Sequence, residues 1–324
     1  MPKIIGREVN LGVAKETTRG TPADPTYWVQ KATCLIIDKV EKLINNETLG
    51  VIEDSDDAKI ATKSSEGTFA GKIGLNSFGL FLLNIFGNVQ SEQQSAPNDD
   101  VYSHTFTVAQ NHQHDSLTLT VSDGIKNLSF PLSMIKTLKI DCVVGDFVRF
   151  TISTVGSSGT TFTGTVAYTK ENNFIARDVI FKMADNLAGL PGASAIKVKS
   201  ISYTFNQNVE PNFVLGQYTP EDNPNKEWGV EVEVVLNWET AAYYDLYTDN
   251  ALKAVRIEMT SEDVIGENLH PKLTTDFAKC AFTELSKAGG VGDVITQTLK
   301  LKPLFSVSDS LMAKAVLLNE VESY

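Results

Sequence analysis

Cysteine and histidine are scarce in this chain, with 3 cysteines and 4 histidines among 324 residues. The cysteines Cys34, Cys142 and Cys280 lie more than a hundred residues apart, which excludes CxxC pairs. Such spacing leaves no framework for a structural zinc or a set of disulfides. We therefore expect three buried thiols in a protein that works in a reducing compartment.

Long hydrophobic runs and excess positive charge are also missing. The most apolar stretch, residues 78–87, is far shorter than the roughly 20 residues of a membrane span. The first ten residues lack the apolar core of a signal peptide. With 28 basic and 40 acidic residues the net charge is -12, so nonspecific phosphate binding has no electrostatic source. The composition predicts a soluble protein with no membrane contact that does not clamp nucleic acid.

Recognisable catalytic sets are absent as well. The sequence contains no GxSxG, HExxH or GxxxxGK[ST] motif, and the glycine-rich segment 156–164 lacks the lysine of a phosphate loop. His112 and His114, next to Asp115, would suit the metal site of a hydrolase, but a polar hairpin tip between two strands explains the same string better. We expect no enzyme activity, no cofactor and no metal.

The residues that are present favour β-structure. Apolar and polar side chains alternate with period two at 104–108, 117–121, 134–140 and 147–152, and similar runs fill the second half. The segments 76–86 and 240–248 predict two short helices. We predict a mainly β fold, all-β with short helices, built as two tandem β-sandwich domains that are each flanked by a helix. The predicted boundaries are an N-terminal arm over 1–30, a first domain over 31–160 and a second over 161–324.

An internal duplication supports the two domains. Leu75-Asn76 and Leu236-Asn237 each join a predicted strand to a short aromatic helix. Upstream, residues 46–50 match 212–216 around a Leu-Gly pair, and downstream 143–146 match 290–293 around a Gly-Asp pair. Because the matches keep the same order, they indicate a duplicated β domain.

Two acidic features point outward from such domains. In the segment 230–234, alternation places three valines on one sheet face and Glu231 and Glu233 on the other. The segment 43–65 is long, polar and without calcium-loop spacing, so we expect a solvated or partner-facing loop that a partner orders. Its acidic residues are Glu47, Glu53, Asp54, Asp56 and Asp57.

The amino-terminal string suggests a family. Leu11 to Pro22, LGVAKETTRGTP, followed by Tyr27-Trp28, resembles the start of bacteriophage tail tube (major tail) proteins. The order of later elements is similar too, from the Leu49-Gly50 loop to the helix ending at Phe86-Gly87. The resemblance implies a structural virion protein whose β-sandwich domains join into six-domain rings, which stack around a channel for DNA.

The resemblance also implies partners. The chain would assemble with itself, and two tandem domains would need three copies, as a pseudo-hexamer, to close one ring. Tape measure, tail terminator and distal tail or baseplate proteins would be its other partners, and DNA would pass through the lumen unbound. The protein would reside in the virion tail after assembly in the host bacterial cytoplasm. Glu231 and Glu233 would face the lumen or, as the alternative, bulk solvent on the outside of the tube. The acidic segment would lie between subunits or rings.

A binding module remains the alternative. A two-domain β-sandwich adhesin or carbohydrate binder of a phage or cell surface would fit the same composition. Its sugar platform would come from aromatic residues around one strand and helix, namely Trp228, Trp238, Tyr243, Tyr244 and Tyr247. Core packing is the simpler role for these side chains.

Overall fold

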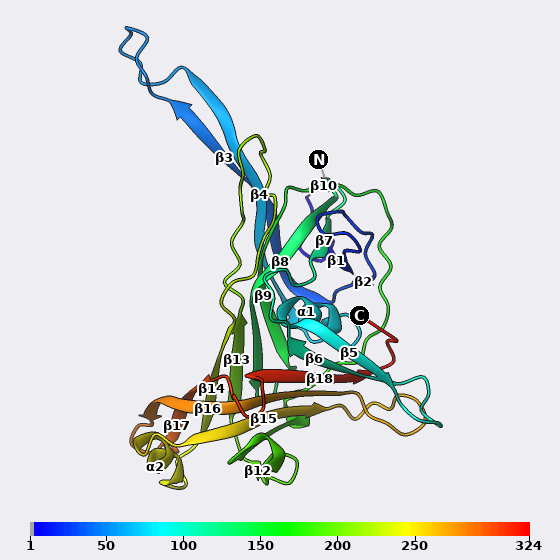
Figure 1. Cartoon of the computed structure of the whole chain (residues 1–324), viewed down its shortest axis with the longest axis vertical. Helices are drawn as coiled ribbons and strands as arrows, with labels where there is room; N and C mark the ends of the chain where they lie inside the picture. The colour runs from blue at the N-terminus through cyan, green and yellow to red at the C-terminus, as the bar shows by residue number, and fades with distance from the viewer. Residues whose placement is uncertain (1–2) are drawn as a thin grey trace.

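The computed structural model describes residues 3–324 and confirms a mainly β chain with short helices (Figure 1). The strands of the first half are β1 (Asn10–Lys15), β2 (Tyr27–Trp28), β3 (Lys31–Asn45), β4 (Asp57–Lys72), β5 (Gly87–Gln93), β6 (Tyr102–Val108), β7 (Leu117–Ser122), β8 (Leu128–Val143), β9 (Arg149–Gly156) and β10 (Thr160–Thr161). Those of the second half are β11 (Val179–Ala184), β12 (Ala195–Ile196), β13 (Ser200–Asn206), β14 (Gly229–Asn237), β15 (Leu252–Thr260), β16 (Lys272–Ala288), β17 (Thr296–Pro303) and β18 (Ala313–Asn319). The helical elements are α1 (Phe78–Phe86), α2 (Ala242–Thr248) and the 3₁₀ turns η1 (Ala176–Asp178) and η2 (Leu187–Gly189).

All strand pairings are antiparallel and organised around two long strands, β8 and β16. One series runs β3–β4–β9–β8–β13–β14–β17–β16 through both halves of the chain. The first part of β8 also pairs with β7 and β10, and the first part of β16 pairs with β15 and β18. Each long strand therefore belongs to two layers, which share one hydrophobic core.

The pairing pattern of the first half recurs in the second. The series β3–β4–β9–β8 corresponds to β13–β14–β17–β16, and β2–β1–β7–β8 corresponds to β12–β11–β15–β16. The hairpin of β5 and β6 has no counterpart in residues 179–319. We call residues 10–161 the first repeat and 179–319 the second repeat.

The sequence matches fall at equivalent places in the two repeats. Leu75-Asn76 follows β4, and Leu236-Asn237 ends β14. Gly50 and Gly216 both turn with positive φ, at 84° and 87°, in the connections that follow β3 and β13. Gly145 (φ 88°) and Gly292 (φ 99°) do the same in the β8–β9 and β16–β17 connections. The short dipeptide matches thus mark tight turns that only glycine makes without strain.

The predicted boundaries do not separate two sheets. β13 of the second repeat pairs with β8 of the first, with Tyr203 opposite Ile140, and β18 pairs with β6. Part of the expected arm is also core, because β1 pairs with β7 along its length and Leu11 and Val13 are fully buried. The turn formers after residue 15 hid this short strand from pattern analysis. The division into two domains stays a prediction, and the two units share strand pairing.

The helix predicted at 76–86 is confirmed as α1, and every one of its residues is buried. It ends at Gly87, whose φ of 78° closes the helix in the left-handed conformation. The ring centroid of Phe81 lies 5.5 Å from that of Phe69 on β4 and 5.7 Å from that of Phe150 on β9. This aromatic cluster fixes the helix against the sheet.

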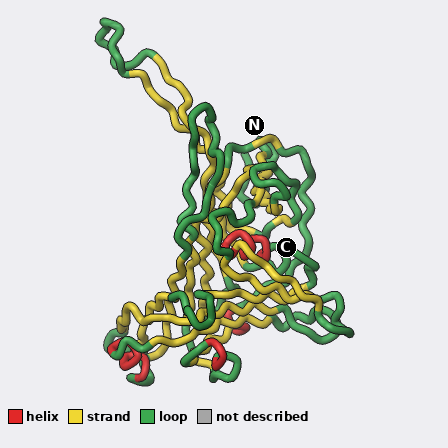
Figure 2. The backbone as a smooth tube through the Cα atoms, in the orientation of Figure 1, coloured by secondary structure: helices red, strands yellow, loops and turns green. Residues whose placement is uncertain are grey.

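The expected loop over 43–65 is mostly a hairpin. β3 continues to Asn45 and β4 begins at Asp57, so only residues 46–56 form the connection. The hairpin extends far from the body of the molecule (Figure 1, upper left; Figure 2). The sequence-based prediction failed here because cross-strand backbone hydrogen bonds hold the two strands together whatever the polarity of their side chains.

Candidate functional site: the polar face, rims and edges of the sheet

One face of the eight-strand series is buried, and the opposite face is polar where β8, β13, β14 and β17 lie side by side. On β13 the side chains of Ile201, Tyr203 and Phe205 are buried, while Ser202 and Thr204 lie on the opposite face. The residue pairings between neighbouring strands show that this polar face continues from β8 to β17. Ser202 stands opposite Asp141 on β8 and opposite Glu233 on β14, and Glu233 stands opposite Lys300 on β17.

Glu231 and Glu233 lie on this polar face, where a groove of about 670 Å³ runs between β8 and β17. Their charge is partly balanced. Lys302 Nζ lies 3.9 Å from a Glu231 carboxylate oxygen, and Lys300 Nζ lies 2.7 Å from that of Glu284. The hydrogen bond to Glu284 raises the pKa of Lys300, and the charges of Glu233 and Glu231 add to this effect. The face is a mixture of carboxylates and amines, with Glu231 83% exposed.

The two ends of the eight-strand series are open in the described part of the chain. β3 pairs with β4 only, and residues 282–288 of β16 pair with β17 only. On the side of the sheet that faces away from the core, β3 also exposes the apolar side chains of Leu35 (73%) and Ile37 (65%). Unpaired strand edges of this kind are templates for pairing with another chain.

The loops at the two ends of the strands form two rims. In each rim, equivalent loops of the first and second repeats expose an apolar side chain. At one rim the β3–β4 tip carries Leu49, and the β13–β14 connection carries Leu215, which are 69% and 102% exposed. At the other rim the β8–β9 and β16–β17 connections expose Val144 (73%) and Val291 (111%).

The acidic residues predicted for a partner-facing loop are all at the β3–β4 tip. Glu47, Glu53, Asp54 and Asp56 lie in the connection, Asp57 begins β4, and all are exposed. Although the segment is rich in polar residues, the same tip exposes several large apolar side chains: Leu43, Ile44, Leu49, Val51 and Ile52.

The amino-terminal string forms a turn around a buried carboxylate. Glu16 is 5% exposed. Its carboxylate accepts hydrogen bonds from the backbone N–H groups of Gly20 (2.7 Å) and Leu132 (2.7 Å). The hydroxyls of Ser116 (2.5 Å) and Thr118 (2.9 Å) donate to it as well. Sequence reasoning used this string only as a family marker and missed its structural role.

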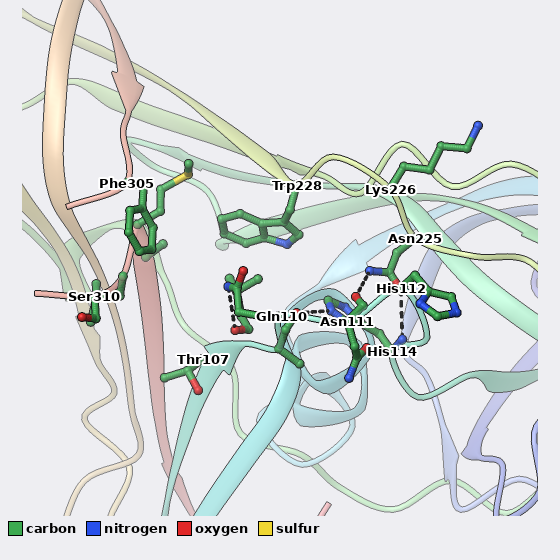
Figure 3. Close-up of a pocket in the computed structure, with 15 residues that line it drawn as sticks. Thr107, Gln110, Asn111, His112, His114, Asn225, Lys226, Trp228, Phe305 and Ser310 are labelled. Atoms are coloured by element: carbon green, nitrogen blue, oxygen red, sulfur yellow. Dashed lines mark hydrogen bonds between the residues drawn. The ribbon is translucent and has the colours of Figure 1, made fainter. Parts of the chain in front are cut away.

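His112 and His114 line a pocket of about 800 Å³ between β6 and the β17–β18 connection (Figure 3). His114 is 2% exposed, and its backbone N–H donates to Asn225 Oδ1 at 2.9 Å. Asn225 in turn donates to the carbonyl of Asn111 at 2.9 Å. Within residues 3–324 no group of three or more His, Cys, Asp or Glu side chains is placed to hold a metal ion.

Two aromatic residues of the alternative hypothesis, Trp238 and Tyr244, lie beside the same ammonium group of Lys287, whereas Trp228 lies at the other end of β14. Trp228, before β14, packs against Phe86 and Phe205 with ring centroids 5.5 and 5.7 Å away. Trp238, after β14, lies under the Lys287 ammonium, 3.2 Å from its ring centroid. Trp228, which is partly buried against the core, therefore does not join Trp238 and Tyr244 in one sugar platform.

These features define a mainly β protein with open sheet edges. No helix among residues 3–324 is long and apolar enough to cross a bilayer. The sequence matches the profile of the phage tail tube protein family over residues 6–301, and the chain belongs to this family. It is a structural protein of the phage tail, as its amino-terminal string indicates. Comparison with curated proteins finds no significant match.

Proposed function

We propose that three copies of the chain close into a ring and that the rings stack into a tube through which phage DNA passes into the host. The observation that carries this proposal is the pairing of β8 with β13. This pairing joins the first repeat to the second. The counterpart of β8 in the second repeat is β16, and the counterpart of β13 in the first repeat is β3. Both of these counterparts have an open edge.

Ring closure follows from repeating that junction. The open part of β16, residues 282–288, pairs with β3 of the next copy, as β8 pairs with β13 within the chain. Three chains then supply six similar units, and no edge of the eight-strand series stays exposed. Closed symmetry of this kind removes the aggregation risk that open edges carry.

The polar face then lines the channel, because the opposite face is the core. Glu231 and Glu233 repeat around each ring and repel DNA phosphates over about 8 Å at physiological salt. The neighbouring lysines Lys300 and Lys302 are engaged by carboxylates, so they offer DNA no free row of amines. The channel lets DNA slide without a binding minimum.

The rims form the contacts between rings. The β3–β4 tip, with Glu47, Glu53, Asp54, Asp56 and Asp57, reaches beyond the body of one ring toward the next. Its exposed leucines and isoleucines are buried at that contact, which supplies the stacking free energy. The family resemblance adds tape measure, tail terminator and distal tail or baseplate proteins as partners, in a virion tail assembled in the host cytoplasm.

Electron microscopy of the concentrated purified protein tests this function. We expect stacked rings with six density lobes, and a ring mass of three chains by native mass spectrometry. Rings with six identical copies would refute the three-copy closure. A protein that stays monomeric, or forms one closed oligomer that never stacks, would instead favour the binding-module alternative.

A further inference from the structure

Arg19, in the turn held by Glu16, reaches a segment of the chain some two hundred positions away. Its Nε donates to the carboxylate of Asp222 at 2.7 Å and its Nη2 donates to the carbonyl of Asn223 at 3.1 Å. Its Nη1 donates to the carbonyl of His114 at 2.5 Å. One guanidinium therefore joins the first repeat to the β13–β14 connection of the second.

The acceptor segment is the base of the second repeat's rim loop. The backbone N–H of Asn212 donates to the carbonyl of Asp222 at 2.8 Å, which closes the loop that exposes Leu215 and Gly216. Arg19 and Asp222 have side chains only 23% and 18% exposed. A shielded, multiply bonded ion pair of this kind holds its partners better than an exposed one.

A second connection passes through a strained residue of β8. Leu132 has a φ of 54°, a left-handed conformation that a leucine adopts at a cost. Its N–H donates to Glu16, and its carbonyl accepts from the side-chain amide of Asn223 at 2.8 Å. Leu132 is thus held by hydrogen bonds from both repeats.

Further side chains attach the same segment. Gln113 donates to the second carboxylate oxygen of Asp222 at 2.9 Å. Although burial raises the pKa of Asp222, the hydrogen bonds from Gln113 and Arg19 and the charge of Arg19 outweigh it and lower that pKa. Asp222 therefore stays charged at neutral pH and keeps its attraction for Arg19.

We propose that Arg19, aimed by Glu16, is a positioning residue that locks the rim loop of residues 212–222 onto the first repeat and so prepares the subunit for assembly. This inference rests on the proposed ring and its stacking. The rim loop is the counterpart of the β3–β4 tip. A ring of three chains carries three tips and three rim loops on the same side, and these form a regular contact surface only if each rim loop has a fixed position. A loop that is already ordered in the free subunit loses less conformational entropy when the ring assembles.

We call the contacts of Arg19 with His114, Asp222 and Asn223 the clamp. Hydrogen exchange of the isolated subunit tests the clamp directly. We expect Arg19→Ala to speed exchange in residues 212–225 by about tenfold or more, because hydrogen bonds to a charged group are lost there. Exchange in α1 and β9 stays unchanged. Arg177→Ala is the matched control, since Arg177 is an exposed arginine just before the second repeat and its ion pair with Glu262 lies outside the clamp.

Two further variants separate positioning from general stability. Arg19→Lys keeps the charge but loses the fork of donors, so we expect intermediate exchange in residues 212–225, and it carries the test if Arg19→Ala does not fold. Glu16→Gln should loosen the same residues, although the described hydrogen bonds to the Glu16 side chain all come from residues 20, 116, 118 and 132.

The assembly readout is the yield of tubes by sedimentation and electron microscopy. The clamp predicts fewer tubes from Arg19→Ala than from the wild-type protein or Arg177→Ala. Unchanged exchange in a folded Arg19→Ala subunit overturns the clamp, and so does a loosened loop with a wild-type yield of tubes. If the wild-type protein itself forms no rings, the proposed function fails, whereas the exchange result still decides whether Arg19 holds the loop.

Discussion

Replacement of both channel glutamates by lysine gives the sharpest test of the proposed lumen. Each Glu→Lys change alters the charge by two units, so Glu231→Lys/Glu233→Lys adds four positive units to each chain. Glu231 loses its pairing with Lys302, and the substituted side chain repels that amine instead. The polar face then presents a cluster of amines where carboxylates stood.

The magnitude follows from counterion release. In a three-copy ring the double variant places about six new amines on the channel wall, and each amine that neutralises a phosphate of duplex DNA steepens the logarithmic salt dependence of binding by about 0.9. Six contacts give a slope of about -5. Between 50 and 200 mM salt the affinity of the variant tubes for DNA should therefore fall by about a thousandfold.

The assay measures nuclease-resistant DNA that sediments with assembled tubes at the two salt concentrations. Wild-type tubes should retain little DNA at either concentration, and the double variant should retain DNA at 50 mM and release it at 200 mM. A control variant, Glu92→Lys/Glu320→Lys, makes the same charge change at exposed positions on β5 and after β18, outside the polar face. Equal, nuclease-sensitive retention by both variants would refute the assignment of Glu231 and Glu233 to the lumen.

Three further predictions concern the subunit. Burial raises the pKa of Glu171 above its usual 4.5 despite hydrogen bonds from Ser77 and Asn76, so the stability that this group contributes is full below pH 4.5 and falls as the pH rises through the folded pKa. Glu171→Gln should flatten that fall in urea unfolding between pH 4.5 and 7, and an unchanged pH profile would contradict the argument. Burial raises the pKa of Cys34 to about 11 and that of Cys142 to about 12, so both should resist thiol reagents at pH 8 until the protein unfolds; rapid labelling of the folded chain would show that the sites open. Replacing residues 47–56 with a short turn should preserve the circular dichroism spectrum but abolish tubes, and tubes of normal length would remove the tip from the stacking contact.

The elements that sequence analysis found are those with a strong local period. The helix at 76–86 was predictable because Phe78, Phe81, Leu82 and Ile85 recur at helical spacing and Gly87 stops the run. The alternation around Glu231 and Glu233 likewise distinguishes the wet face of β14 from its dry face. β1 was missed because its six residues give too short a pattern and turn formers follow at once.

The candidate sites divide in the same way. The acidic residues of the β3–β4 tip were visible as a charge run, but the long hairpin that carries them was not, since hydrogen bonds between strand backbones leave no mark on side-chain polarity. The role of Arg19 was invisible, because its partners Asp222 and Asn223 lie far along the chain and no local pattern links them.

By itself, the sequence determined the mainly β class, the family and the order of the duplicated segments, because strand periodicity, glycine turns and a short amino-terminal string are local properties. Only the tertiary structure decided that β13 pairs with β8, that the two repeats share one sheet, and which edges of that sheet stay open. Strand order and register depend on which apolar faces meet in three dimensions, and many pairings satisfy the same local pattern. The proposed ring rests on that non-local choice.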